Sequence, residues 1–388
     1  MTDATEQRAY FDYAATAPFD VRLADVIASA SWANANSLYA EGREARRQLD
    51  DARRRIARAL GARQPAEILF TSGGTEGDNM AVKGLIEPNA KPTDTHVIVS
   101  NIEHHAVLDS AMSLKRYGYH VHTVACDKNG IVTAQALSDA IDKALAGGGK
   151  LAVVSVMAVN NELGTIQPVR ELARVAHDAG AKFMTDCVQA LGKIEIDLEK
   201  SGVDAAVFSG HKVGALKGVG VVYVRRSAKI QPLLFGGGQE MGLRSGTSNV
   251  MGAVCMARAI EFAVAEREEN WEHAAALRER ILAGIDGLDA EHALVRTLAD
   301  DSRCIPHTLS LVANELEGET VVQRLDAAGI AASSGSACAT GSLDPSYVLM
   351  ALGMSKQQAY GSLRLSFGAG TTDADVDQLL AALPGALR

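Results

Sequence analysis

The sequence lacks a surplus of basic residues, a long apolar run and an obvious leader. Its 47 acidic residues outnumber the 38 basic ones, which gives a formal net charge of −9. Proteins that bind nucleic acids or anionic membranes usually present a basic surface, so we expect neither kind of partner. No apolar run is long enough to cross a bilayer. Residues 1–18 contain no basic region followed by an apolar core, so we expect no signal peptide and a cytoplasmic location.

Cysteine is scarce as well, and its spacing excludes two kinds of site. The five cysteines are scattered and never form a C-x-x-C pair, which argues against a disulfide framework and a zinc site. A free cysteine is usually a small buried hydrophobe. We expect that packing role for all but one of them. The four with this packing role are Cys126, Cys187, Cys255 and Cys304. The exception is Cys338, which lies in "AASSGSACATGS", residues 331–342, where the serines and glycines are typical of a flexible loop.

Aromatic residues make up only 5% of the chain, although apolar residues reach 47%. Such a core, built from Ala, Val, Leu and Gly, suits an α/β protein with buried strands and alanine-rich helices. Strand-like and helix-like segments alternate through the first two-thirds of the sequence, which indicates a mostly parallel sheet covered by helices. The predicted strands span 66–72, 95–101, 119–126, 151–160, 182–186, 204–210 and 218–224.

The pattern changes after this region. Residues 250–285 read as one long helix that bridges two domains, and a smaller α/β unit follows. In that unit we expect strands at 307–313, 330–334 and 362–368, and helices at 318–329, 344–353 and 372–387.

Polar residues follow several predicted strands, where open α/β sheets bind their ligands. In "TSGGTEGDN", Gly73 and Gly74 allow a tight turn and Thr75 begins a helix, whose N–H groups favour an anion such as phosphate. The alternative is an ordinary glycine-rich turn. Asp186 ends another strand, and Lys212 follows a third in "SGHK".

Lys212 has two interpretations: a solvated loop lysine, or an amine with a lowered pKa that forms a Schiff base. Together, a lysine, an aspartate and a phosphate-binding turn are what pyridoxal phosphate (PLP) requires. The lysine bonds to the aldehyde, the aspartate keeps the pyridine nitrogen protonated, and the turn binds the phosphate.

Nine motifs in order resemble the NifS/IscS-type cysteine desulfurases, which are PLP enzymes of the class-V aminotransferase fold (fold type I). They are "DYAATAP", "TSGGTEGDN", "EHHAVLD", "VNNELGTIQPV", "TDCVQALGK", "FSGHK", "GGGQEMGLRSGT", "SSGSACATGSLDPSYVLMALG" and "SLRLSFG". The resemblance implies a large PLP-binding domain, residues 19–259, with a mostly parallel seven-stranded sheet flanked by helices. It also implies a smaller α/β domain, residues 1–18 and 260–388, which carries a mobile catalytic loop at about 333–343.

The same resemblance implies roles for the residues around the cofactor. Lys212 would bond covalently to PLP, Asp186 would pair with the pyridine nitrogen, and Gln189 would hydrogen-bond the ring oxygen. His104 would stack on the ring and take part in proton transfer; a helix-start histidine or half of a metal site is the alternative. We expect no metal, because His104 and His105 are adjacent and no set of residues has ligand spacing. The implied phosphate ligands are Gly74, Thr75, Ser209, His211 and, from a partner subunit, Thr247.

The resemblance further implies how the substrate is bound and cleaved. Arg364 would bind the substrate carboxylate, with a surface strand arginine as the alternative, and Asn161 and Asn34 would lie near the substrate. Cys338 would take sulfur from L-cysteine as a persulfide, release alanine, and pass the sulfur to an acceptor protein, either an iron–sulfur scaffold or a thiolation protein. A homodimer is expected. The rival functions are a selenocysteine lyase, another class-V aminotransferase, or a non-catalytic partner or scaffold that retains the fold.

Overall fold

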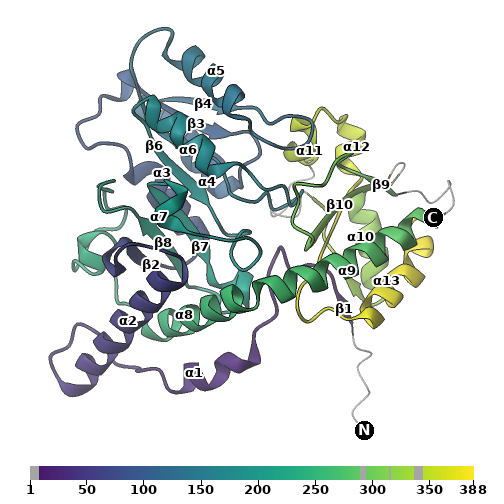
Figure 1. Cartoon of the computed structure of the whole chain (residues 1–388), viewed down its shortest axis with the longest axis horizontal. Helices are drawn as coiled ribbons and strands as arrows, with labels where there is room; N and C mark the ends of the chain where they lie inside the picture. The colour runs from purple at the N-terminus through teal and green to yellow at the C-terminus, as the bar shows by residue number, and fades with distance from the viewer. Residues whose placement is uncertain (1–7, 289–293, 314–315, 336–343) are drawn as a thin grey trace.

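The computed structural model describes residues 8–288, 294–313, 316–335 and 344–388 of the chain. The predicted loop cysteine, Cys338, lies outside these ranges. Two lobes of different size make up the molecule, joined by a pair of consecutive helices (Figure 1).

A seven-stranded sheet forms the larger lobe, as the sequence predicts. Its order is β2-β8-β7-β6-β5-β3-β4, and every neighbouring pair is parallel except those that involve β8. The strands are β2 (Ile68–Thr71), β3 (Thr95–Ser100), β4 (His120–Val124), β5 (Lys150–Ser155), β6 (Lys182–Asp186), β7 (Ala205–Ser209) and β8 (Gly220–Val224).

Helices cover both faces of this sheet, because most of its strands are apolar on both sides. Alternate side chains point to opposite faces: Phe183 and Phe208 pack on one side, Met184 and Val207 on the other. Helices α3 (Gly74–Gly84) and α4 (His105–Ser113) cover the second face. The first face is covered by α2 (Ala40–Ala59), α5 (Ala134–Leu145), α6 (Val169–Asp178), α7 (Leu198–Ser201) and α8 (Val250–Ala265).

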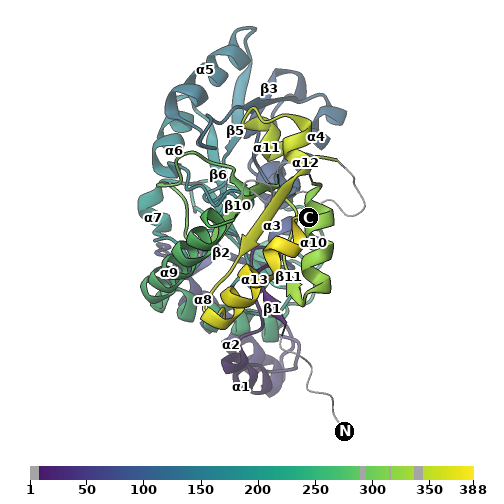
Figure 2. The same ribbon diagram turned by 90° about the vertical axis from the view of Figure 1, so that its right-hand side faces the viewer.

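The smaller lobe holds two short sheets packed against helices (Figure 2). An antiparallel sheet has the order β12-β10-β9, and β1 pairs in parallel with β11, which brings the N-terminal segment into this lobe. The sequence did not indicate β1 or β9, which have only two and three residues. The elements are β1 (Ala9–Tyr10), β9 (Leu294–Arg296), β10 (Thr308–Ala313), β11 (Ile330–Ala331), β12 (Ser362–Ser366), α9 (Arg267–Asp286), α10 (Gly318–Ala327), α11 (Tyr347–Ala351), α12 (Lys356–Tyr360) and α13 (Asp373–Ala386).

The predicted single helix over 250–285 is interrupted at Glu266. Helix α8 ends before this residue and α9 begins after it, because the Glu266 backbone has φ −94° and ψ 5°. Ile260 of α8 packs in the large-lobe core, whereas Ala274 of α9 packs in the small-lobe core with Phe11. This division of the cores supports the predicted two-domain organisation, while its boundary at residue 259 stays a prediction.

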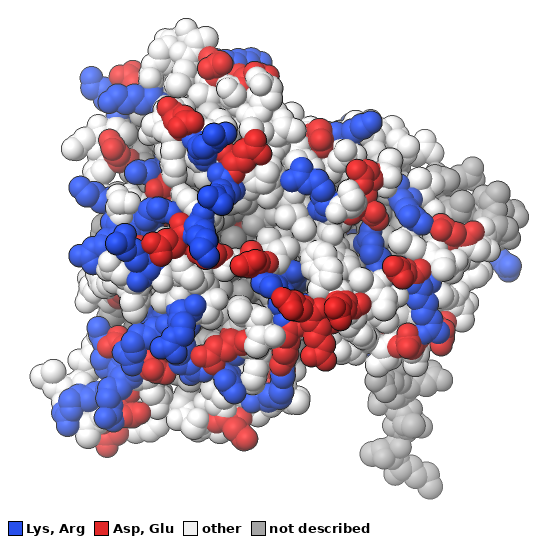
Figure 3. Space-filling view, in the orientation of Figure 1, with Lys and Arg blue, Asp and Glu red and all other residues white. Residues whose placement is uncertain are grey.

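Short elements complete the described chain: α1 (Ala24–Ala28) and the 3₁₀ segments Val21–Leu23, Pro65–Glu67, Pro92–Asp94, Leu114–Tyr117, Gly210–Val213 and Glu240–Gly242. Within the described ranges, no helix combines the length and the apolar character that a bilayer crossing requires. On the face shown in Figure 3, acidic and basic side chains are interspersed.

Candidate active site

A cavity of about 210 Å³ lies at the carboxyl edge of the large sheet, where β12 of the small lobe approaches it. Most predicted site residues line it, although they come from segments far apart in the sequence. Among the described residues the exceptions are Asn34 and Thr247, while Cys338 lies outside the described ranges. The predicted residues in its wall are Gly74, Thr75, His104, Asn161, Asp186, Gln189, Ser209, His211, Lys212 and Arg364.

Lys212 extends from the 3₁₀ segment after β7 toward the N-terminal segment. Its Nζ donates hydrogen bonds to the carbonyl oxygens of Ala14 and Ala15, both at 2.6 Å. The side chain is half-buried and lines the cavity. The structure therefore places Lys212 at the site, and its interpretation as the amine that forms a Schiff base stays a prediction.

Asp186 ends β6 at the buried floor of the cavity. Its Oδ1 accepts a hydrogen bond of 2.7 Å from the backbone N–H of Val188, and burial raises the pKa of the carboxyl group. Asp78, on α3, is a buried acid whose pKa burial also raises, and the charge of Asp186 adds to this effect. The Asp78 Oδ1 atom meets no hydrogen-bond donor among the described residues. A cationic group bound beside these two acids would offset the cost of burying their charge.

His104 combines two interpretations that the sequence left open. It is the N-cap of α4, where its Nδ1 accepts a 3.1 Å hydrogen bond from the Ala106 N–H, and its ring also lines the cavity. Burial, with the nearby charge of Lys212, lowers the pKa of His104 to about 4. Since Nδ1 accepts, the neutral ring carries its proton on Nε2.

The glycine-rich turn forms one wall of the cavity. A Cβ atom at Gly74 would lie 3.1 Å from Val188 Cγ2, and one at Gly220 of β8 would lie 2.7 Å from the Gly73 backbone. The turn therefore packs too closely for larger residues. Gly73, the N-cap of α3, offers the first helical N–H groups no side-chain acceptor. Such a helix start favours a bound phosphate.

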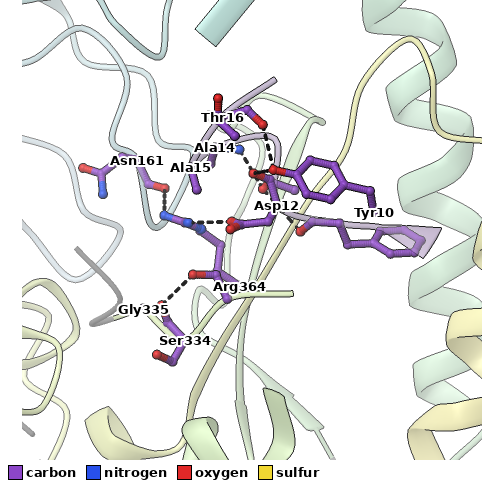
Figure 4. A network of polar contacts seen from close by, with 12 residues as sticks. Tyr10, Asp12, Ala14, Ala15, Thr16, Asn161, Ser334, Gly335 and Arg364 are labelled. Atoms are coloured by element: carbon purple, nitrogen blue, oxygen red, sulfur yellow. Dashed lines mark hydrogen bonds and ion pairs between the residues drawn. The ribbon is translucent and has the colours of Figure 1, made fainter. Parts of the chain in front are cut away.

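Arg364 reaches the opposite wall from β12 (Figure 4). Its guanidinium donates to Asp12 Oδ1 at 2.9 Å and to the Asn161 carbonyl at 3.2 Å. Its side chain is 2% exposed, so it is not the surface arginine of the alternative interpretation. Two polar atoms here, Arg364 Nε and Asn161 Oδ1, find no partner in the part of the chain that the structure describes. A ligand with an anionic group for Arg364 Nε and a hydrogen-bond donor for Asn161 Oδ1 would satisfy both atoms.

Two predicted residues lie elsewhere in this chain, and a third is outside the described residues. Asn34 is exposed before α2, where its Oδ1 accepts from the Asn36 N–H. Thr247 is exposed before α8. Neither is among the described residues that line the cavity. A role for Thr247 through a partner subunit, and the roles of Asn34 and Cys338, stay predictions.

The four described cysteines are buried or half-buried, as a packing role requires. Burial raises the pKa of all four thiols, for Cys126 and Cys304 to about 11. A thiol with a raised pKa is a poor nucleophile at neutral pH, which leaves none of the four suited to attack.

Several residues that line the cavity or contact its walls were not predicted from the sequence. Ala14, Met157 and Val188 contribute backbone or apolar surface, for which sequence offers no chemical signal. Asp78 could have been found, because an acid between Gly77 and Met80 on an otherwise buried helix face is unusual. Asp12, the partner of Arg364, lies in the quoted motif "DYAATAP".

A larger hollow of about 970 Å³ lies between α6, α7 and β6. Thr185 and Cys187 line it, so it faces the opposite side of β6 from Asp186. It contains neither Lys212 nor Arg364, and we therefore place the chemistry in the smaller cavity. No cluster of three or more metal-ligating side chains occurs within the described ranges.

The family model of the class-V aminotransferases matches residues 9–379. An IscS-like cysteine desulfurase of Mycobacterium tuberculosis is 41% identical over 384 residues, which cover 98% of this chain and 96% of that protein. The chain belongs to this family, the NifS/IscS-type cysteine desulfurases. A solved NifS-like protein has a TM-score of 0.88 at 36% identity, with 98% of this chain and 99% of that chain covered. The fold and the family predicted from the motifs are thus confirmed.

Another similar structure is that of SspA in complex with cysteine, at 32% identity and a TM-score of 0.77, covering 92% of this chain and 98% of that one. Enzymes of this family are PLP-dependent. The residues of the cavity fit PLP: an amine at Lys212, a buried carboxylate at Asp186 and a helix start at Gly74 match its aldehyde, its pyridine nitrogen and its phosphate.

Proposed function

We propose that this protein is a PLP-dependent cysteine desulfurase, which removes the sulfur of L-cysteine, releases L-alanine and holds the sulfur as a persulfide on Cys338. One observation supports the proposal most: Lys212, Asp186, His104 and Arg364, from separate segments, line a single cavity of about 210 Å³. An amine, an acid, an imidazole and a guanidinium in these positions serve an amino-acid substrate on an aldehyde cofactor.

The wall residues would hold PLP at distinct points. Lys212 would bond to its aldehyde, and Asp186 would pair with its pyridine nitrogen. Gln189 would donate to its ring oxygen. Bound PLP withdraws electrons from the substrate Cα, which makes the Cα proton acidic. The phosphate would lie at the start of α3, held by Gly74, Thr75, Ser209, His211 and the partner subunit's Thr247.

Arg364 would orient the substrate by its carboxylate. Its Nε and the Asn161 Oδ1, both without partners among the residues described, provide a donor for the carboxylate and an acceptor for the substrate amine. Asp12 already holds one end of the guanidinium, so the side chain is set before substrate arrives. Asn34, whose predicted place is near the substrate, would have to approach from a partner subunit.

Lys212 and His104 would carry out the proton transfers. When it is not bonded to the cofactor, the Lys212 amine would be the base that takes the Cα proton of the substrate. His104 is neutral near pH 7, because burial lowers its pKa to about 4, and its Nε2–H points away from the cap. It can stack on the cofactor ring and donate through Nε2.

Cys338 completes the sulfur transfer. Its thiolate would attack the substrate sulfur, so that an S–S bond forms as the substrate C–S bond breaks and the bonding electrons return to the carbon side. That carbon then takes up a proton, and the product is alanine. A later thiol exchange would pass the sulfur to an acceptor protein, an iron–sulfur scaffold or a thiolation protein.

A homodimer would complete the site with Thr247. Large apolar side chains are exposed in the chain segments that precede α2 and α8: Trp32 is 84% exposed, Leu38 89% and Phe235 83%. Exposed apolar residues of this size favour association. A sedimentation measurement would find twice the 40.8 kDa mass of the chain. A cytoplasmic location stays a prediction.

The function is tested with two variants of the PLP-loaded protein. In Lys212→Ala the cofactor should no longer be covalently bound after borohydride reduction. In Cys338→Ala the visible absorbance of the bound cofactor should remain, whereas alanine release from L-cysteine should stop. Cys304→Ala, at a half-buried cysteine that is not among the residues lining the cavity, is the control and should keep full activity. Full activity in Cys338→Ala would remove this residue from the mechanism.

The rival functions give different results in the same assay. A selenocysteine lyase would release alanine from L-selenocysteine with far higher kcat/KM than from L-cysteine. Another class-V aminotransferase would require a keto acid, and a non-catalytic scaffold would show no cofactor absorbance. The serine- and glycine-rich segment around Cys338 favours the desulfurase.

A further inference from the structure

Lys193 lies beside the site but outside its wall. The described residues that line the cavity do not include it; it lines a neighbouring cavity of about 410 Å³, which shares Lys212 with the site. Its Nζ donates a 2.7 Å hydrogen bond to Oε1 of Gln189, four residues earlier in the chain. This hydrogen bond connects Lys193 to the site through the Gln189 side chain.

The contacts with Lys193 and with Ala14 together determine which way the Gln189 amide faces. An ammonium group only donates hydrogen bonds, so the amide must turn its oxygen toward Lys193 and its nitrogen toward the cavity. The nitrogen does face the cavity, because Nε2 donates to the Ala14 carbonyl at 2.9 Å and Ala14 lines the wall. An amide nitrogen has two hydrogens, and the second is available to a ligand.

The position is an unfavourable one for a cation. Burial, together with the charges of Lys212 and Arg364, lowers the pKa of Lys193 to about 7. Lys193 in turn lowers the pKa of the buried His307 ring. Among the described residues, Lys212 and Arg364 are thus the charged groups that lower its pKa, and His307 is a titratable group on which Lys193 acts. A ligand with negative charge would favour the ammonium form and so strengthen the contact with Gln189.

We propose that Lys193 is a positioning residue, which fixes the Gln189 amide so that Nε2 presents a hydrogen to the ring oxygen of PLP. The inference rests on the proposed function. It assigns to Lys193 no contact with cofactor or substrate. Negative charge on the ring oxygen would favour a proton on the nitrogen that joins Lys212 to PLP. A hydrogen-bond donor held at this oxygen would weaken that effect, so it would lower the pH at which the nitrogen loses its proton.

The test compares Lys193→Met with the matched control Lys83→Met. Lys83 is also half-buried, and its Nζ donates at 2.9 Å to the amide oxygen of Asn79, again four residues earlier, but it does not line the cavity. For Lys193→Met we expect PLP to bind about 5- to 10-fold more weakly, the effect of one hydrogen bond. The pH at which the visible absorbance changes should rise by about one unit. Lys83→Met should match the wild type in both, and Lys193→Arg should restore most of the loss.

A double variant shows whether Lys193 acts through Gln189. In a Gln189→Leu background, adding Lys193→Met should change PLP affinity and the absorbance pH less than it does in the wild type. Fully additive effects, or a Lys193→Met protein that matches the Lys83→Met control, would overturn the proposal. If the wild type itself shows no cofactor absorbance, the proposed function fails and this inference fails with it. Gln189→Glu, which keeps an acceptor for Lys193 but removes the donor, should reproduce the Lys193→Met shift even if the methionine variant folds poorly.

Discussion

Arg53 and Arg364 are both buried, yet their surroundings differ in one respect. Arg53 of α2 forms a bidentate ion pair with Glu240, in which Nη1 donates to Oε2 at 2.7 Å and Nη2 donates to Oε1 at 2.8 Å. It also donates to the Ile68 carbonyl. The same carboxylate accepts a 2.9 Å bond from the Phe70 N–H. Every partner of Arg53 is supplied by the fold itself.

Arg364 has fewer hydrogen-bond acceptors around its guanidinium among the described residues. It contacts one oxygen of Asp12, a carboxylate that is 21% exposed, and one carbonyl, while its Nε has no acceptor in the described part of the chain. A buried donor without an acceptor costs about 1–3 kcal/mol unless a ligand supplies one. A buried arginine whose N–H groups all have acceptors stabilises the fold, whereas one with an N–H group that lacks an acceptor indicates a binding site.

The strain at Glu240 supports this interpretation of the Arg53 pair. Glu240 and the next residue, Met241, adopt positive φ values of 48° and 60°, which cost on the order of 1 kcal/mol each for residues other than glycine. Such a conformation persists only where surrounding contacts hold it. The ion pair with Arg53 joins this strained segment to α2 and β2, so it serves the packing of the large lobe.

The largest expected effect is on stability, at Arg53. In Arg53→Met the Glu240 carboxylate stays buried without its partner, and the free energy of unfolding should fall by about 3–5 kcal/mol. Denaturant unfolding of the PLP-loaded protein measures this loss. A companion, Arg47→Met, removes an exposed arginine from the same helix and should change stability by less than about 1 kcal/mol. Equal losses in the two variants would contradict the structural role of the buried pair.

Arg364 should show the reverse pattern. In Arg364→Met, kcat/KM for L-cysteine should fall by about 100- to 1000-fold, because the charged hydrogen bond between the guanidinium and the substrate carboxylate is lost. The free energy of unfolding should fall by less than that of Arg53→Met, since Asp12 is partly exposed and can regain water. Steady-state kinetics and denaturant unfolding on one preparation separate the two effects. A variant that loses stability as Arg53→Met does, yet keeps its kcat/KM, would remove Arg364 from the substrate site.

The two arginines also show how far the sequence can be interpreted. The strand that contains Arg364 is predicted from the apolar period of residues 362–368. The interpretation of Arg364 as the residue that binds the substrate carboxylate came from a motif resemblance. Nothing in the sequence paired Arg53 with Glu240, which is 187 residues away. Such pairs depend on tertiary packing, and a local pattern carries no information about it.

The same limit applies around the cavity. Residues whose side-chain chemistry is distinctive, such as Lys212 and Asp186, were predicted and do line it. Residues that act through their backbone, such as Ala14, were not. The break of the bridging helix at Glu266 was also missed, because the helical period continues on both sides of it.

The smallest effect concerns the glutamates near the two arginines. Unlike Glu240, the buried Glu162 makes no ion pair within the described ranges, although Arg364 is near enough to lower its pKa. Its Oε2 accepts from the Ser346 hydroxyl at 2.5 Å. Burial dominates and raises the pKa of Glu162 from 4.5 to about 7. The folded protein therefore binds this proton more tightly than the unfolded chain does.

It follows that Glu162 favours folding most below pH 4.5, and that this contribution is lost as the pH rises through about 7. Between pH 5 and pH 8 the wild type should lose more unfolding free energy than Glu162→Gln, by on the order of 1–3 kcal/mol. Other buried acids, such as Glu103, are present in both proteins, so their contributions cancel in the difference. Denaturant unfolding across this range measures it. Parallel stability profiles would show that Glu162 is ionised in the folded protein, and that Arg364 compensates its charge as Arg53 does for Glu240.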